Sequence, residues 1–172
     1  MAAEGEPAVP GARAGAGSTR TDDTDQGPQV GALSAEEQHR RRQAVPPLLL
    51  STPYVTWLGL EVIRYEPDDV AMRLPLRHEL TNDGENYHGG VVAAALDTTG
   101  GLAAFSNHDF DRGMRPATVS LAVQYVAAAR GSDLYCTATV VRRVRELTFS
   151  EITATDAAGT VLAHALQTYR IA

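Results

Sequence analysis

Hydrophobic positions along the chain follow two periods, one typical of strands and one typical of a helix. Apolar and polar residues alternate over 70–76, which predicts a strand that returns after a turn at 66–69. A preceding strand is predicted over 57–65. Four further β segments follow later, separated by short turns with Gly and Asp: 118–128, 134–142, 147–155 and 160–170. Residues 89–105 are instead apolar or small at nearly every position, which predicts one long helix.

The predicted order is β-β-α-β-β-β-β, which places the chain in the α+β class. A single helix of this length can be covered by one curved antiparallel sheet. One face of the helix consists of small residues with one carboxylate: Gly90, Ala93, Ala94, Asp97, Gly101 and Ala104. Gly100 and Gly101 inside a helix each cost roughly 1 kcal/mol relative to Ala. We therefore expect another group to approach the helix backbone closely at these glycines.

The chain divides into three predicted regions. Residues 1–33 are rich in Ala and Gly and show no hydrophobic period, which predicts a disordered tail. Residues 34–47 form a short helix and linker; Ser34 and Glu37 supply a capping box, and Pro46-Pro47 are expected to end the helix. Residues 48–172 form the packed domain.

Composition excludes several classes of protein. The 172 residues carry a net charge of −6 and a pI near 5.3, which argues against a sequence-independent nucleic-acid binder. The single cysteine, Cys136, excludes a disulfide within the chain and a cysteine-based zinc site. No apolar run approaches the ~20 residues of a membrane span. The first residues lack the basic and apolar segments of a secretory signal, so we expect a cytoplasmic protein.

The segment His88-Gly89-Gly90 stands at the start of the predicted helix. The first backbone N–H groups of a helix have no intrahelical partner, and the helix dipole favours negative charge there. Glycines allow a ligand to come close to those groups. This pattern indicates an oxyanion site suited to acyl transfer.

Asp97 follows His88 by nine residues, which is ~2.5 helical turns, or ~13 Å along the axis and about halfway round it. Asp97 therefore cannot act at the N-terminus of its own helix. If both groups act together, Asp97 must meet the helix N-terminus of a second subunit. A two-fold axis between antiparallel helices would create two equivalent sites, which predicts a homo-oligomer.

The chain at this point resembles a known family. A His-Gly-Gly at the start of a long helix, an Asp nine residues on and Asn82 six residues before the His resemble the hotdog-fold acyl-CoA thioesterases of the phenylacetic-acid-pathway (PaaI-like) group. Residues 116–121 match the family's Thr-Val-x-Leu strand, and residues 156–163 resemble its last hairpin. The resemblance covers about residues 50–172. It implies a hotdog fold and hydrolysis of acyl-CoA, or another pantetheine thioester, by a dimer or a homotetramer.

The resemblance also implies roles for individual residues. The Gly89 N–H and the Asn82 amide would polarise the thioester carbonyl, and Asp97 would act as a general base or as a nucleophile. Thr118 would orient the carboxylate or the water, and His88 would hold the loop near the leaving thiol. No metal or cofactor is implied, because the CoA thiolate leaves readily. Substrate contacts are expected at Gly90, Arg142, Arg143 and Arg145. The family's Arg-x-Gly-Arg is Arg142-Arg143-Val144-Arg145 here, which puts the local turn in doubt.

Plainer interpretations exist for each residue. Asp97 could be a solvated charge or a carboxylate bonded to Thr98 or Thr118, and His88 could serve only as a helix cap. Asn82 suits an ordinary turn, Thr118 suits a strand, and the arginines suit a solvated strand edge. At the level of function, the alternatives are a non-catalytic module that binds acyl-CoA or lipid and, third, a hotdog dehydratase. The sequence leaves the acyl group and its carrier open.

Overall fold

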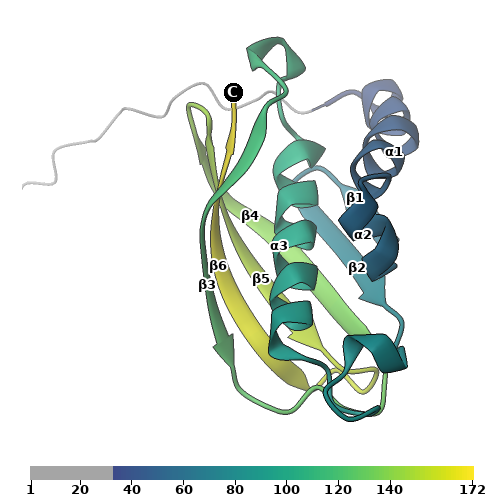
Figure 1. Ribbon diagram of the computed structural model, residues 1–172. Helices are drawn as coiled ribbons and strands as arrows, with labels where there is room; N and C mark the ends of the chain where they lie inside the picture. The colour runs from purple at the N-terminus through teal and green to yellow at the C-terminus, as the bar shows by residue number, and fades with distance from the viewer. Residues whose placement is uncertain (1–32) are drawn as a thin grey trace, which may run out of the picture.

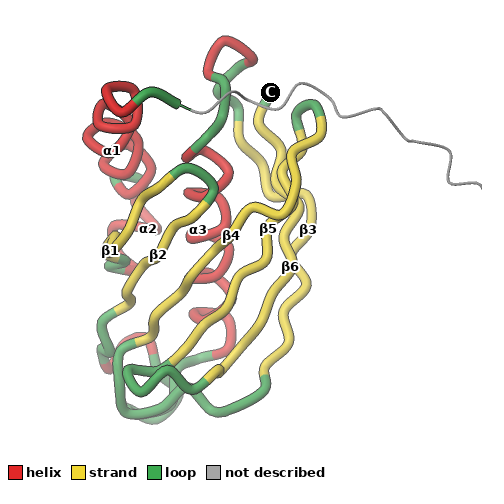
Figure 2. The backbone as a smooth tube through the Cα atoms, turned by 180° about the vertical axis from the view of Figure 1, so that it is seen from behind, coloured by secondary structure: helices red, strands yellow, loops and turns green. Residues whose placement is uncertain are grey.

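The computed structural model describes residues 33–172, so nearly all of the predicted disordered tail lies outside the described residues. One six-stranded sheet curves around helix α3 (Gly89–Ser106) (Figures 1 and 2). The predicted order β-β-α-β-β-β-β and the α+β class are confirmed. The strands are β1 (Glu61–Glu66), β2 (Asp69–Leu74), β3 (Pro116–Tyr125), β4 (Leu134–Val144), β5 (Leu147–Thr155) and β6 (Val161–Ile171). Two 3₁₀ turns flank α3, η1 (His78–Leu80) and η2 (Phe110–Arg112).

The strands lie in the order β1-β2-β4-β5-β6-β3, and every neighbouring pair is antiparallel. Strand β3 follows α3 in the chain but lies at the edge of the sheet, beside β6 (Figure 1). Bulges interrupt the pairing near Thr118 on β3 and after Val140 on β4. Both bulges change which side chains face α3.

Helix α3 is the centre of the core. Its only charged residue is Asp97, so nearly its whole circumference can be buried. Leu96, Leu102 and Phe105 are at most 2% exposed and pack with Met72 and Ile152 of the sheet. Burial of such side chains contributes roughly 1.5–3 kcal/mol each. The expectation that a single curved sheet covers this helix is confirmed.

The predicted end of the first helix is wrong. Helix α1 (Ala35–Leu50) begins with the predicted Ser34 cap, but it continues through Pro46 and Pro47. Val45 and Pro46 are buried against the domain, and this packing offsets the hydrogen bonds that two prolines remove from a helix. The predicted boundary between residues 47 and 48 falls inside α1.

The first predicted strand also needs correction. Residues 57–65 do not form one strand, because Trp57 and Leu58 end a short helix, α2 (Pro53–Leu58). Pro53 occupies the first turn of that helix, where proline is favoured, and Gly59 ends it with a φ of 77°. Strand β1 starts only at Glu61. Helices α1 and α2 lie beside α3 and the β1–β2 hairpin (Figure 1). In the described part of the chain, no helix is long and apolar enough to cross a membrane.

Candidate active site

Asp97 is held at the middle of α3 by a residue of the edge strand β3. The hydroxyl of Thr118 donates a hydrogen bond of 2.8 Å to Asp97 Oδ1. Asp97 is partly exposed and Thr118 is exposed, so the pair lies at the surface of this chain. The structure thus joins two of the predicted site residues, and of the bonds considered for Asp97 it selects the one to Thr118.

The pattern of the sequence did not reveal a third member of this cluster, Gln167 on β6. Its Nε2 donates to Asp97 Oδ1 at 2.7 Å and to the Asp97 backbone O at 3.0 Å. Asp97 Oδ1 therefore accepts two hydrogen bonds, while Oδ2 accepts none from residues 33–172. Gln167 is 2% exposed. The available signal was the alternation of β6, which places a polar side chain at an inward position among apolar and aromatic residues.

Gly100 and Gly101, the two mid-helix glycines of α3, face side chains of β6. A Cβ at Gly100 would stand 2.2 Å from Gln167 Oε1, and one at Gly101 would stand 3.1 Å from Cε2 of Tyr169. The expected close approach to the helix backbone is therefore confirmed, and the approaching groups are side chains of β6. Burial, together with the negative charge of Asp97, raises the pKa of Tyr169 to about 12.

The N-terminus of α3 leaves one N–H group available. His88 caps the helix: its Nδ1 accepts from the Gly90 N–H at 3.0 Å, and its backbone O accepts from Val91 and Val92. The Gly89 N–H has no acceptor among residues 33–172. Because the Gly90 N–H is occupied by His88, Gly89 is the backbone donor that remains for a ligand. The Tyr125 hydroxyl donates to the Gly89 carbonyl at 2.8 Å and ties this end of α3 to β3.

Asn82 lies in the loop that leads into His88. Its backbone N–H donates to Asn86 O at 2.8 Å, and its side chain is exposed. The neighbouring Asp83 carboxylate accepts from the backbone N–H of Asn86 and of Glu85 and from the Asn86 amide. These bonds lower the pKa of Asp83 to about 2 and fix the turn. No hydrogen bond in the described chain links Asn82, His88 or Gly89 to Asp97, so the predicted site residues form two separate groups, one at the start of α3 and one around Asp97.

The three arginines expected to bind substrate are not equivalent. Arg143 points toward α3, and its five N–H groups are all engaged: Nε and Nη2 with Asp68, Nη2 with Ala103 O, and Nη1 with Ala104 O and Thr148 Oγ1. No donor of Arg143 is left for a phosphate, which argues against its predicted role. Arg142 and Arg145 are exposed. Arg145 adopts a φ of 55°, so this residue, rather than Val144, takes the left-handed position of the turn.

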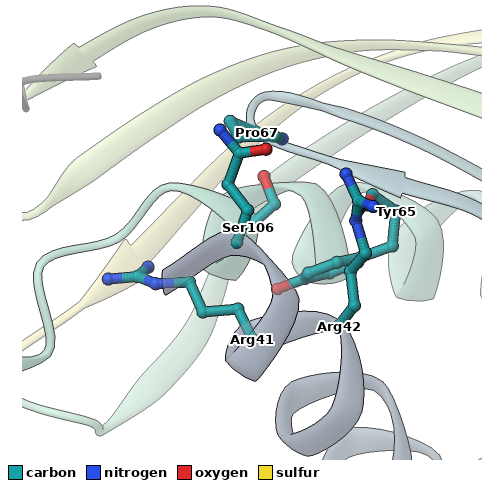
Figure 3. Close-up of a pocket in the computed structure, with 6 residues that line it drawn as sticks. Arg41, Arg42, Tyr65, Pro67 and Ser106 are labelled. Carbon is teal, nitrogen blue, oxygen red and sulfur yellow. Dashed lines mark hydrogen bonds between the residues drawn. The ribbon is translucent and has the colours of Figure 1, made fainter. Parts of the chain in front are cut away.

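The structure also has a small pocket that lies away from Asp97 and its hydrogen-bond partners. Figure 3 shows it between α1 and the β1–β2 hairpin, where Arg41 and Arg42 approach Tyr65, Pro67 and Ser106. It has no room for a water-sized molecule and shares no residue with the group around Asp97 or the group at the start of α3. The described residues also contain no group of three His, Cys, Asp or Glu side chains that could hold a metal ion.

Comparison with known proteins decides the family. A model of the thioesterase superfamily matches residues 84–163. A Halobacterium salinarum protein named as a presumed esterase is 35% identical over 109 residues, which cover 62% of this chain and 72% of that protein. This chain belongs to the thioesterase superfamily.

Solved structures of the thioesterase superfamily share its fold. A Shewanella oneidensis protein described as related to that superfamily superposes with a TM-score of 0.71 at 26% identity, over 78% of this chain and 97% of its own. The Escherichia coli PaaI protein of the phenylacetic acid degradation operon superposes with a TM-score of 0.69 over 78% of this chain and 95% of its own. Its identity of 15% shows the fold alone. The predicted hotdog thioesterase fold is confirmed, and the membership identifies a thioester hydrolase in general terms.

The match of the thioesterase superfamily begins within the loop before His88 and covers α3 and most of the sheet. It therefore spans Gly89, Asp97 and Thr118 and ends before Gln167.

Proposed function

We propose that this chain hydrolyses acyl-CoA or other pantetheine thioesters to a free acid and a thiol, with Asp97 as the general base. The observation that carries the proposal is the state of its carboxylate. Thr118 and Gln167 both bind Oδ1, and Oδ2 is left without a partner in the described chain. A carboxylate fixed on one oxygen and open on the other is suited to take a proton from water.

The proposed site is completed by a second copy of the chain. Gly89 and Asp97 lie eight residues apart on one straight helix, or ~12 Å along its axis, too far for one carbonyl group to contact both. Strand β3 is a ten-residue edge strand, and most of its residues are exposed. Val119 and Tyr125 are 58% and 54% exposed. A long apolar edge of this kind favours pairing with another chain.

In the proposed mechanism, Asp97 Oδ2 accepts a proton from water while the water oxygen forms a bond to the thioester carbon. The carbonyl electron pair moves onto oxygen, which the partner copy's Gly89 N–H stabilises. The carbonyl then re-forms, the C–S bond breaks, and its electron pair leaves on sulfur. The proton held by Asp97 passes to the thiolate, so that one thioester and one water give one acid and one thiol.

The remaining predicted residues have supporting roles in this proposal. Asn82 would add a second donor to the carbonyl oxygen, because its exposed side chain lies on the loop before the helix N-terminus. His88 caps that helix through Nδ1, so the neutral ring carries its proton on Nε2, which we propose lies near the leaving thiol. Arg142 and Arg145 are the exposed arginines proposed to bind the phosphates of CoA.

The experiment is steady-state hydrolysis of a panel of acyl-CoA esters by the wild type and by Asp97→Ala. We expect turnover of at least one ester and a loss of ~10²–10⁴-fold in kcat in the variant. Wild-type rates in Asp97→Ala would refute the assignment of Asp97. Saturable binding of the esters with no release of thiol would instead favour the non-catalytic acyl-CoA or lipid-binding module.

A further inference from the structure

We propose that Gln167 is the positioning residue of Asp97, and that it selects Oδ2 as the oxygen that reacts. This inference rests on the proposed function. Only 2% of Gln167 is exposed. Its side chain reaches α3 from β6, and the residue lies 70 positions after Asp97 in the sequence. It stands on the sheet side of Asp97, so it would contact no substrate.

The geometry of the amide explains how it holds the carboxylate. One NH₂ group contacts two acceptors of the same residue, the backbone O and the side-chain Oδ1 of Asp97. The helix backbone fixes the first acceptor, and the amide is planar, so the second bond fixes the side-chain torsions of Asp97. If the amide were flipped, Gln167 Oε1 would face two acceptors, the backbone O and Oδ1 of Asp97, and could bond to neither. The donor assignment therefore follows from the acceptors present.

Helix α3 is shaped to admit this amide. Gln167 Oε1 lies where any side chain at position 100 would stand, since a Cβ there would be 2.2 Å away. A glycine inside a helix lowers helix stability relative to alanine, but at position 100 it leaves the space that Gln167 needs to reach Asp97. Ser150 faces Gln167 across the β5–β6 pairing, but its hydroxyl forms no hydrogen bond within the described chain.

The arrangement is poor for stability alone, which is why we infer a functional role. Gln167 Oε1 is buried and has no hydrogen-bond partner in the described chain. A buried carbonyl oxygen without a partner destabilises the fold, whereas a methionine of similar volume would leave no such group. The amide is therefore expected to contribute through Asp97 rather than through packing.

The two carboxylate oxygens of Asp97 therefore have different roles: Oδ1 accepts the hydrogen bonds that hold the group, and Oδ2 is open to react. With Gln167 and Thr118 both on Oδ1, a proton delivered to the carboxylate goes to Oδ2. Loss of Gln167 would leave the carboxylate held by Thr118 alone, so that it could rotate and expose either oxygen to water. Such a change lowers the fraction of Asp97 in the productive orientation and leaves substrate binding unchanged.

The test compares Gln167→Met and the near-isosteric Gln167→Glu with the control Ser150→Ala, which alters the neighbouring buried group that does not touch Asp97. Measurements are kcat, KM and thermal unfolding on the best thioester, in wild-type and Asp97→Asn backgrounds. We expect both Gln167 variants to lower kcat ~10–100-fold, with KM within about 3-fold of the wild-type value.

The controls address stability and the route of the effect. Gln167→Met should unfold at no lower temperature than the wild type, and Ser150→Ala should keep kcat within about 3-fold. In the Asp97→Asn background, Gln167→Met should change the residual rate less than about 2-fold.

Three results would separate the possible failures. A wild type that hydrolyses no thioester overturns the proposed function and the positioning role with it. An inactive Asp97→Asn beside a fully active Gln167→Met overturns only the positioning role. Equal losses from Gln167→Met with and without Asp97 would show that the amide acts on the fold and not through the carboxylate.

Discussion

Thr118 and Asp97 join the edge strand β3 to the centre of helix α3 through one hydrogen bond of 2.8 Å. The bond spans 21 residues of sequence and ends on the same carboxylate oxygen that Gln167 contacts. The bulge between Thr118 and Ser120 turns the start of β3 so that this hydroxyl faces the helix.

Thr118→Val removes this donor while retaining the β-branched shape of the side chain. We expect kcat to fall ~10-fold, because the carboxylate keeps only the bond from Gln167. Thr118→Ser retains the hydroxyl and is expected to keep kcat within about 3-fold. Steady-state kinetics of the two variants on one thioester provide the comparison, and equal rates for both would exclude a role for the hydroxyl.

Gly89→Pro tests the backbone donor at the start of α3. Proline lacks the N–H but is favoured in the first turn of a helix, and the extended backbone of His88 (ψ 133°) is compatible with a following proline. We expect kcat to fall ~10²–10³-fold, the usual cost of one oxyanion donor. Gly89→Ala is the matched control, because it keeps the N–H and its Cβ would meet Tyr125 at an ordinary 3.7 Å. A Gly89→Pro enzyme with wild-type kcat would exclude this N–H as the donor.

Substitutions of Arg143 and Arg142 are expected to have different effects, the first on the stability of the fold and the second on substrate binding. Arg143→Met removes the guanidinium donors from Asp68 Oδ1 and from the Ala104 carbonyl near the end of α3. We expect a loss of about 2–3 kcal/mol in the free energy of unfolding, less than for a fully buried pair, with KM for acyl-CoA unchanged. Arg142→Met should keep the stability and raise KM. Denaturant unfolding and steady-state kinetics measure both effects, and a raised KM in Arg143→Met alone would reverse the assignment.

The protonation of His108 is expected to make the stability of the fold depend on pH. Burial, with smaller contributions from the positive charges of Arg143 and Arg41, lowers its pKa below the ordinary 6.5, although the bond to Gly113 O opposes the shift. The unfolded chain then binds a proton more readily than the folded one. Stability should therefore be full above pH 6.5 and fall as the pH drops through the lowered pKa. His108→Gln should reduce the slope of the melting temperature between pH 7 and pH 5, and an unchanged slope would contradict this account.

The sequence predicted the parts of the site that depend on local patterns. A cap, two glycines and a long apolar run define the start of α3, and the position of Asp97 follows from the helical repeat. Gln167 could not be assigned in this way, because its contact with Asp97 depends on the register of β6 against a helix 70 residues earlier. Arg143 faces inward because the bulge between Val140 and Arg142 reverses the alternation of β4. The path of α1 through two prolines likewise depends on tertiary burial, which local propensity does not describe.

The central claim is that one active site uses Asp97 of one copy and Gly89 of another, and co-assembly of two inactive variants tests it most directly. Asp97→Ala and Gly89→Pro are co-expressed with different affinity tags, and the mixed assembly is purified on both tags. If the site is shared, each mixed dimer has one complete site and one that lacks both groups. We therefore expect about half of the wild-type kcat per dimer, although each variant alone is inactive. A mixed assembly as inactive as its two parents would contradict the shared site.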